Sequence, residues 1–482
     1  MIKYQPKHST ELLYQLFGSF IFIIIAFFLS RPTANNDIFV QLLAIDGILS
    51  NFDFSEMGHH SLGIAVTASL LKLCKLDPLI CLYFLQPFLC GLCFWILYRL
   101  LKTVLPSKYA FFMTFSSLSS LVFIKSMNQV TAEIISLTTI LLLMTYVWKI
   151  FIQNNKMTFI IVTNIVILSW IAILFRNAAI FIIIGILIFL FINNKFSKLS
   201  FFIVSTIMLL PGGVKTLFYY NQPVCTDNLF SISLPLKIIT QFTKHFLNFT
   251  EVIFPYSLHL NRIPWLKLII VICSLLFLLF ITRYKKDLEV ENNKRKLLGN
   301  YFFTVGMSYY CILSFASVYY DSNWGELYRV SGFGILFILN GFWLYIFSYA
   351  IKWRKYILII LMISSITKIS YGLRYEILSE RHRFLFQDYR RSVNSIIDYV
   401  DGRREEVFVY IGEPWEDINL FYLLKYYDLI YSLPFEVSQY KDQKEKTSSV
   451  ILCTEKDLNH FQVLKYRFNK IPGLDKVYSV VN

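Results

Sequence analysis

Charged residues are scarce in this chain of 482 residues. They make up 16% of it, while hydrophobic residues make up 56% and the mean hydropathy is +0.55. Because a soluble chain normally has about a quarter charged residues, this one cannot cover the surface of a soluble globule of its size. The apolar excess lies in long runs, for example at 20–29 and 134–147. These features exclude a soluble enzyme and a disordered protein, and they predict a multi-pass membrane protein.

Several signatures of other protein classes are missing as well. The eight cysteines are scattered, and the CxxC pair of Cys90 and Cys93 lies inside the apolar run at 79–101 rather than in a βαβ redox unit. The sequence contains no GxGxxG or GxxxxGKS/T nucleotide motif, no internal repeat and no low-complexity tract. The first apolar stretch, at about 13–30, has no small-residue cleavage site, so we expect a retained anchor. A disulfide scaffold is excluded.

The formal net charge of +15 would suggest a nucleic-acid partner in a soluble protein. Here most of the surplus Lys and Arg flank apolar segments, where anionic headgroups and the membrane potential favour them. No basic stripe interleaved with aromatic residues occurs in a soluble segment. We therefore expect the lipid bilayer, and not nucleic acid, as the partner of these charges.

The apolar runs predict about eleven transmembrane helices, since a bilayer core of ~30 Å needs roughly 20 apolar residues per helix. The predicted spans are 12–30, 79–101, 109–124, 133–152, 157–174, 178–193, 199–217, 265–282, 299–319, 331–351 and 356–373. Every second connection between the predicted spans is rich in Lys and Arg. The positive-inside rule places these connections, and the N-terminus with them, in the cytoplasm. An odd number of spans places the C-terminus outside, in a protein of the cell membrane.

Two connections on the predicted outer side are long, at 31–78 and 218–264. Within the first, 37–50 has apolar residues at helical spacing, and 61–74 is apolar but short for a span. We predict that both are helices lying along the outer membrane interface.

From about residue 387 the composition becomes that of a soluble domain. Helical and strand patterns alternate there, which predicts a small α/β layer. The predicted helices are 392–400, 417–427 and 456–468, and the predicted strands are 407–411, 449–453 and 477–481. The expected architecture is an all-α polytopic membrane bundle at 1–375 followed by a C-terminal α/β extracytoplasmic domain at 387–482.

An ionisable residue at the centre of a span marks an ion or proton path by default, and the sequence shows no convincing one. Glu133, Arg176, Lys215 and Lys368 are all predicted at the outer ends of spans. Charged and hydrogen-bonding residues gather at the outer surface instead. This distribution favours a site that takes one substrate from the lipid and another from water.

Short motifs recur at this predicted outer surface. They are Asn36-Asp37 opening an interfacial helix, His59-His60 in a turn, Asp77-Pro78 before a span, Thr131-Ala132-Glu133, Phe175-Arg176-Asn177 and Tyr328-Arg329. The series resembles the polyprenyl-phosphate-dependent membrane glycosyltransferases of the C-type (GT-C) fold, a group that includes protein O-mannosyltransferases and lipid A aminoarabinose transferases. The family often has His-Pro-Pro where this chain has His59-His60-Ser61, and Arg-Tyr in place of Tyr328-Arg329.

The resemblance implies a sugar carried on a polyprenyl phosphate and an acceptor hydroxyl that loses a proton during attack, so a carboxylate is needed as general base. Asp37 matches that position, although Asn36 or Asp37 could simply cap the helix. Glu133 is the second catalytic candidate, positioning the acceptor or a metal. Its alternative is a solvated helix N-terminus favoured by the macrodipole.

The leaving phosphate gains charge in the transition state and calls for fixed cations and donors around it. The resemblance assigns this donor-binding role to Arg329, Arg176, His59, His60 and Tyr328, with arginine the better bidentate phosphate partner. Each arginine could instead snorkel to headgroups. No cofactor is required, but a divalent metal stays open, although the two histidines lack HxxxH or HExxH spacing.

Three other functions compete with sugar transfer. A lipid-linked sugar flippase or transporter would have two related halves and polar interruptions at the midplane, which the sequence does not show. An inner-membrane polysaccharide polymerase would have its large outer loop late in the chain. A structural scaffold would not need polar residues at one depth. The sugar, the glycan, lipid or protein acceptor, and the carrier length are left open by the sequence.

Overall fold

The computed structural model describes residues 7–29, 31–34, 41–42, 44–51, 62–127, 129–153, 158–193, 198–218, 235, 237–241, 290–319, 328–349, 354–378, 407–409, 450–454, 467–470 and 477–481. The chain forms two compact units. The first, called the helical unit below, comprises Met1–Ser30 and Phe84–Glu376, and the second unit comprises Arg31–Tyr83 and Ile377–Asn482.

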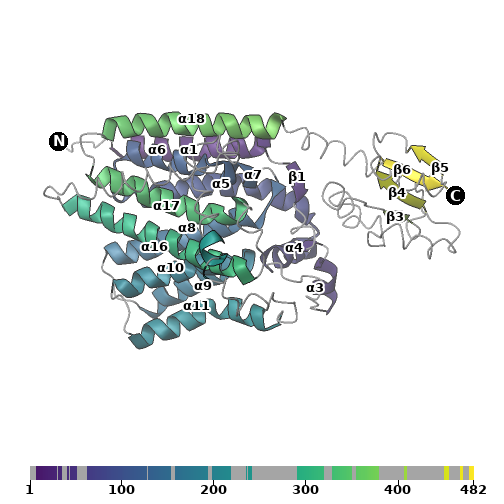
Figure 1. Ribbon diagram of the computed structural model, residues 1–482, viewed down its shortest axis with the longest axis horizontal. Helices are drawn as coiled ribbons and strands as arrows, with labels where there is room; N and C mark the ends of the chain where they lie inside the picture. The colour runs from purple at the N-terminus through teal and green to yellow at the C-terminus, as the bar shows by residue number, and fades with distance from the viewer. Residues whose placement is uncertain are drawn as a thin grey trace. The chain divides into compact units, whose positions relative to one another are not determined.

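Long helices dominate the helical unit, and most of them run along a common direction in Figure 1. The helices are α1 (Lys7–Leu29), α5 (Pro78–Lys102), α6 (Ser107–Leu118), α7 (Leu121–Met127), α8 (Ala132–Ile152), α9 (Phe159–Phe175), α10 (Ala179–Ile192), α11 (Lys198–Phe218), α16 (Val290–Tyr319), α17 (Tyr328–Tyr349) and α18 (Arg354–Leu378). A short strand, β2 (Gln129–Val130), precedes α8.

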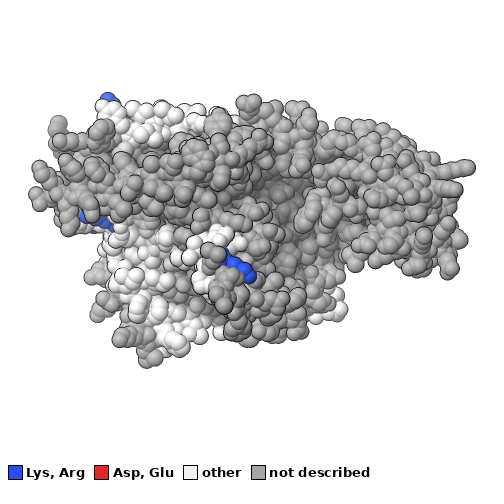
Figure 2. Space-filling model, in the orientation of Figure 1, with Lys and Arg blue, Asp and Glu red and all other residues white. Residues whose placement is uncertain are grey.

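The helices carry apolar side chains on the outside as well as the inside. Phe28 on α1 is 84% exposed and Phe202 on α11 is 70% exposed, and the described part of the surface in Figure 2 is almost free of charge. Three described helices, α1, α5 and α8, are long and apolar enough to cross a membrane, and shorter apolar helices accompany them. Such outward apolar faces are stable against lipid rather than water. The protein is therefore a multi-pass membrane protein.

Nine of the predicted spans each coincide with one helix; of the other two, 265–282 lies outside the described residues and 109–124 differs from the prediction. The number of eleven membrane-crossing helices stays a prediction. The 109–124 span is wrong in its continuity, because the segment forms α6 and α7 with a break at Ser119 and Ser120. Serine hydroxyls compete for the helix backbone there: the Ser117 hydroxyl donates to the Met113 carbonyl at 2.8 Å. A count of apolar residues does not register this competition.

The sequence predicts Lys368 at the outer end of its span, and the structure differs from this prediction. Lys368 lies near the middle of α18, which extends to Leu378, and only 2% of it is exposed. Its ammonium donates to the Ser116 carbonyl at 3.3 Å and the Ser116 hydroxyl at 3.4 Å. In a continuous helix that carbonyl would bond the N–H of Ser120, which bonds Ser117 instead. The lysine therefore caps the negative end of α6 inside the bundle.

Helices α16 and α17 pack closely because glycines face each other at two levels. A Cβ atom on Gly341 would lie 3.2 Å from the Gly299 carbonyl oxygen, and one on Gly306 would lie 3.1 Å from the Gly334 carbonyl oxygen. The higher-numbered glycine of one helix pairs with the lower-numbered glycine of the other, so the two helices are antiparallel. Small residues permit this backbone approach, which in a membrane supplies van der Waals contact that lipid cannot match.

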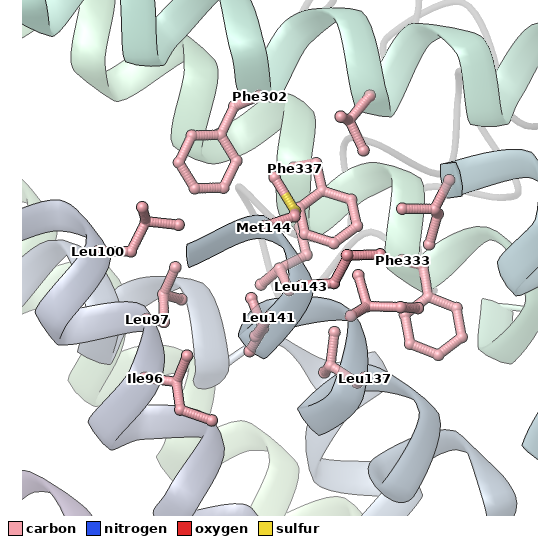
Figure 3. Close-up of a cluster of buried hydrophobic side chains, with 14 of the residues drawn as sticks. Ile96, Leu97, Leu100, Leu137, Leu141, Leu143, Met144, Phe302, Phe333 and Phe337 are labelled. Carbon is pink, nitrogen blue, oxygen red and sulfur yellow. The ribbon is translucent and has the colours of Figure 1, made fainter. Parts of the chain in front are cut away.

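The core of the helical unit lies between α5, α8, α16 and α17. Figure 3 shows its side chains, which converge from these helices on Met144 in the middle of α8. The labelled core residues in Figure 3 are Ile96, Leu97, Leu100, Leu137, Leu141, Leu143, Met144, Phe302, Phe333 and Phe337. The apolar layer holds α8 in place, and the first residues of α8 carry the acidic side chain considered below.

The second unit begins with β1 (Arg31–Ala34), α3 (Ile45–Asn51) and α4 (Gly63–Leu73). Ala44 and Ile48 pack against Ala65, so the two short helices share a small apolar core. A helix at 61–74 is confirmed by α4. Of the helix predicted at 37–50, residues 41–42 are helical and α3 forms the later part, while Asp37 lies outside the described residues.

The same unit ends in a four-stranded sheet with strand order β3-β4-β6-β5. Its strands are β3 (Val407–Val409), β4 (Val450–Thr454), β5 (Arg467–Lys470) and β6 (Val477–Val481). Strands β3 and β4 are parallel, with Val407 opposite Val450, and β6 pairs antiparallel to both β4 and β5. A parallel pair requires a crossover of a dozen or more residues between its strands.

Strands occur in all three segments where the sequence predicts them. The helix predicted at 456–468 is wrong at its end, because β5 begins at Arg467. Pairing with β6 outweighs the local helical pattern there. The helices predicted at 392–400 and 417–427 lie outside the described residues, so the α/β character of the domain stays a prediction.

Candidate functional site

A buried glutamine fixes the connection that leads into α8. The Gln86 amide nitrogen on α5 donates to the carbonyls of Ser126 and Met127, both at 3.2 Å, and its oxygen accepts from the Thr131 N–H at 2.9 Å. Gln86 is 3% exposed. Backbone groups left unpaired at such a break would be strongly unfavourable in a membrane interior, and one amide satisfies three of them. The start of α8 is thereby held against α5.

Glu133 lies in the first turn of α8 and pairs with Arg176 at the end of α9. The Arg176 Nη1 is 2.5 Å from the Glu133 Oε1, and only 16% and 7% of the two side chains are exposed. Arg176 ends α9, where its N–H bonds the Ala172 carbonyl, and its own carbonyl accepts from Ala179 at the start of α10. The pair therefore joins the start of α8 to the turn between α9 and α10.

Aromatic rings line the arginine side of this pair. The Arg176 guanidinium carbon lies 5.7 Å from the centre of the Phe333 ring on α17, a cation–π arrangement. The Tyr309 ring on α16 meets Phe333 edge-on at 6.4 Å and meets Phe181 on α10 at 5.9 Å. Residues of α8, α9, α10, α16 and α17 thus meet at one point. This set of four, Glu133, Arg176, Phe333 and Tyr309, is called the Glu133–Arg176 cluster below.

The burial of the pair decides two alternatives that the sequence leaves open. Glu133 is not a solvated helix cap, because it is 5% exposed and contacts a cation. Arg176 does not snorkel to headgroups, because its guanidinium is engaged by Glu133 and Phe333. With both groups ionised the pair has no net charge. The carboxylate alone would repel a further anion about 4 Å away by about 4 kcal/mol at an effective dielectric constant of about 20, which offsets the attraction of the guanidinium.

No protein-family profile and no curated protein matches the sequence. Solved structures do match the fold. The crystal structure of ArnT from Cupriavidus metallidurans bound to undecaprenyl phosphate matches with a TM-score of 0.52 and 9% identity, over 96% of this chain and 97% of that one. This chain has a C-type glycosyltransferase-like fold. The apo structure of ArnT covers 99% of this chain at the same 9% identity, 98% of its own length and a TM-score of 0.45.

The C-type-like fold agrees with the fold that the resemblance implies, and the individual site residues divide into three groups. Glu133 and Arg176 are brought together. Tyr328 and Arg329 lie in the first turn of α17, whose backbone alone is described there. Asp37, His59 and His60 lie outside the described residues, so their roles remain proposals.

Two residues of the cluster, Phe333 and Tyr309, and the nearby Gln86 were not singled out from the sequence. Phe333 and Tyr309 look like ordinary apolar residues of a span, and nothing local marks them. Gln86 offers a signal, because an amide inside the apolar run at 79–101 needs partners there. Among the described residues, no group of three or more His, Cys, Asp or Glu side chains could hold a metal ion.

Proposed function

We propose that this protein is a membrane glycosyltransferase that moves a sugar from a polyprenyl-phosphate carrier to an acceptor hydroxyl at the extracytoplasmic face. The observation that carries the proposal is the desolvated Glu133–Arg176 pair at one end of the bundle of a C-type-like fold. The matching ArnT crystal structure has undecaprenyl phosphate bound, which supports a carrier of that class here.

In the proposed reaction the acceptor oxygen attacks the anomeric carbon of the sugar. Asp37 takes the hydroxyl proton as general base. The bond between the anomeric carbon and the phosphate oxygen breaks, and polyprenyl phosphate leaves with the bonding electrons. Arg329, Tyr328 and a histidine at 59 or 60 stabilise the charge on the departing phosphate. As part of this proposal, the N-terminus lies in the cytoplasm and the C-terminal domain is extracytoplasmic.

Transfer by the purified protein tests this function. Undecaprenyl phosphate loaded with a radiolabelled sugar is incubated with protein and a membrane extract that contains acceptors, and the label on the acceptor is measured. Wild-type protein is expected to transfer label, and Asp37→Asn to lose at least about a hundredfold, as expected for a general base. An Asp77→Asn variant is the matched control, because Asp77 caps α5 through the Leu79 N–H at 2.9 Å. Full activity of Asp37→Asn would remove Asp37 from its role.

A second function, translocation of a lipid-linked sugar, is favoured by one observation. Lys368 is an ionisable side chain buried inside the bundle, which is the usual mark of a transport path. Vesicles that contain the purified protein and a fluorescent polyprenyl-phosphate sugar separate the two functions. The flippase would be supported if the wild-type protein moved the lipid between leaflets without transferring sugar to an acceptor, and if Lys368→Met abolished this movement.

A further inference from the structure

Arg176 is a poor place for the phosphate of the carrier. Its guanidinium is already neutralised by Glu133 at 2.5 Å, and both side chains are largely removed from solvent. A phosphate bound to the same guanidinium would lie close to the Glu133 carboxylate, and the two anions would repel each other.

The pair suits a neutral ligand with hydroxyl groups instead. A hydroxyl donates one hydrogen bond and accepts others, so neighbouring hydroxyls can bond to a carboxylate and a guanidinium together. Arg176 has a donor to offer, because its Nε is buried and has no hydrogen-bond partner among the described residues. An unpaired buried donor is unfavourable until a ligand or water satisfies it.

The surroundings of the pair point to a ring-shaped ligand with apolar faces. Phe333 lies over the guanidinium and is 5% exposed, and the fully buried Tyr309 supports Phe333 edge-on from behind. Small-molecule sites typically combine such an apolar wall with a few polar groups that fix orientation. A sugar ring has C–H faces for the aromatic wall and hydroxyls on its rim for the charged pair.

We propose that the Glu133–Arg176 cluster is the subsite that recognises the hydroxyls of the transferred sugar, while the carrier phosphate is bound elsewhere. This inference rests on the proposed glycosyl transfer and deepens it. It changes the role that the sequence suggests for Arg176, from phosphate binding to sugar binding. Glu133 then binds and positions the sugar, rather than the acceptor or a metal.

Binding measurements on the full-length purified protein separate the two roles. The probes are bare undecaprenyl phosphate and undecaprenyl phosphate carrying glucose, galactose, mannose or arabinose, each titrated in nanodiscs. For wild-type protein we expect one loaded carrier to bind at least about tenfold tighter than the bare carrier, an increment typical of a few well-placed hydrogen bonds. The double variant Glu133→Gln/Arg176→Gln should lose that increment and keep its affinity for the bare carrier within about twofold.

The double variant leaves no unpaired buried charge, which protects its fold. A second variant, Phe333→Leu, keeps the ion pair and should lower the increment without changing bare-carrier binding. The matched control is Glu11→Gln/Lys102→Gln, which removes the α1–α5 ion pair of 2.7 Å and should change neither affinity.

Three results would overturn the subsite. If the double variant lost affinity equally for bare and loaded carriers, Arg176 would be a phosphate ligand. The proposed glycosyl transfer would not be affected by that result. Equal wild-type affinity for bare and all loaded carriers would mean that no sugar is recognised. If the wild-type protein bound none of the five lipids, the proposed function itself would fail, and the subsite with it.

Discussion

The Nη1 of Arg176 lies 2.5 Å from the Oε1 of Glu133, and this contact ties the end of α9 to the first turn of α8. Both partners are largely buried. Removing one of them leaves the other as an uncompensated charge in a desolvated place, which is much less favourable than removing both.

We therefore predict a non-additive effect on stability. Arg176→Gln and Glu133→Gln should each lower the free energy of unfolding by about 3 kcal/mol, and the double variant by clearly less than the sum. Denaturant titration in mixed micelles measures the free energy of unfolding of the wild type, the two single variants and the double variant. If the two single effects add, the groups do not interact and the contact is not formed in the membrane.

Gln86 should be important for placing Glu133. Gln86→Leu removes three hydrogen bonds, two to the carbonyls of Ser126 and Met127 and one from the Thr131 N–H, and we expect a loss of about 2–3 kcal/mol, near 1 kcal/mol for each bond. Gln15→Leu is the matched control, because the Gln15 amide makes one long bond of 3.5 Å to the Trp95 carbonyl. Similar unfolding midpoints for the two variants would show that the Gln86 hydrogen bonds before α8 contribute little to stability.

The glycine contacts between α16 and α17 should limit side-chain size. A Cβ atom on Gly334 would lie 2.8 Å from Tyr309 Cδ1, so Gly334→Leu must displace a buried ring of the Glu133–Arg176 cluster. We expect a loss of stability of about 1–3 kcal/mol or more, together with reduced sugar transfer. Thr206→Leu, on an exposed face of α11, should change neither quantity. Wild-type stability of Gly334→Leu would mean that these helices are further apart.

Lys368 should be dispensable for sugar transfer. Its bonds go to Ser116, so Lys368→Met removes a buried charge but also leaves the Ser116 carbonyl without this donor, and the two effects oppose each other. We expect Lys368→Met to fold with a stability within about 1 kcal/mol of wild type and to transfer sugar within about threefold of wild type. A loss of transfer in a well-folded Lys368→Met protein would give this lysine a functional role that sugar transfer does not explain.

Local patterns predicted the helices well, because length and hydropathy are properties of single segments. The apolar run at 79–101 becomes α5 (Pro78–Lys102), and the run at 178–193 becomes α10 (Ala179–Ile192). Local patterns did not predict the break at Ser119, because it depends on serine hydroxyls and on Lys368, which lies far along the chain. Contacts between distant segments also decide whether a lysine in a span faces the bundle interior or the headgroups, so the local pattern could not assign Lys368.

The sequence predicted which charged residues belong to the candidate site, but not which residues they contact. Glu133 and Arg176 each stood out as charges at the ends of spans, yet their pairing depends on how α8 packs against α9. Phe333 and Tyr309 carried no signal at all, because aromatic residues are common in spans and only packing distinguishes these two. Under our proposal, burial of both charges changes the role expected of Arg176 from phosphate binding to recognition of a neutral ligand.

The stoichiometry of the reaction tests glycosyl transfer most directly. Purified wild-type protein is given undecaprenyl phosphate loaded with a labelled sugar, and both the sugar on the acceptor and the bare carrier released are quantified over time. We predict that the two rise together in a ratio of about one, as transfer of one sugar per carrier requires, and that Asp37→Asn abolishes both. Lipid that crosses the bilayer with its sugar still attached, and no bare carrier released by the wild type, would contradict this prediction.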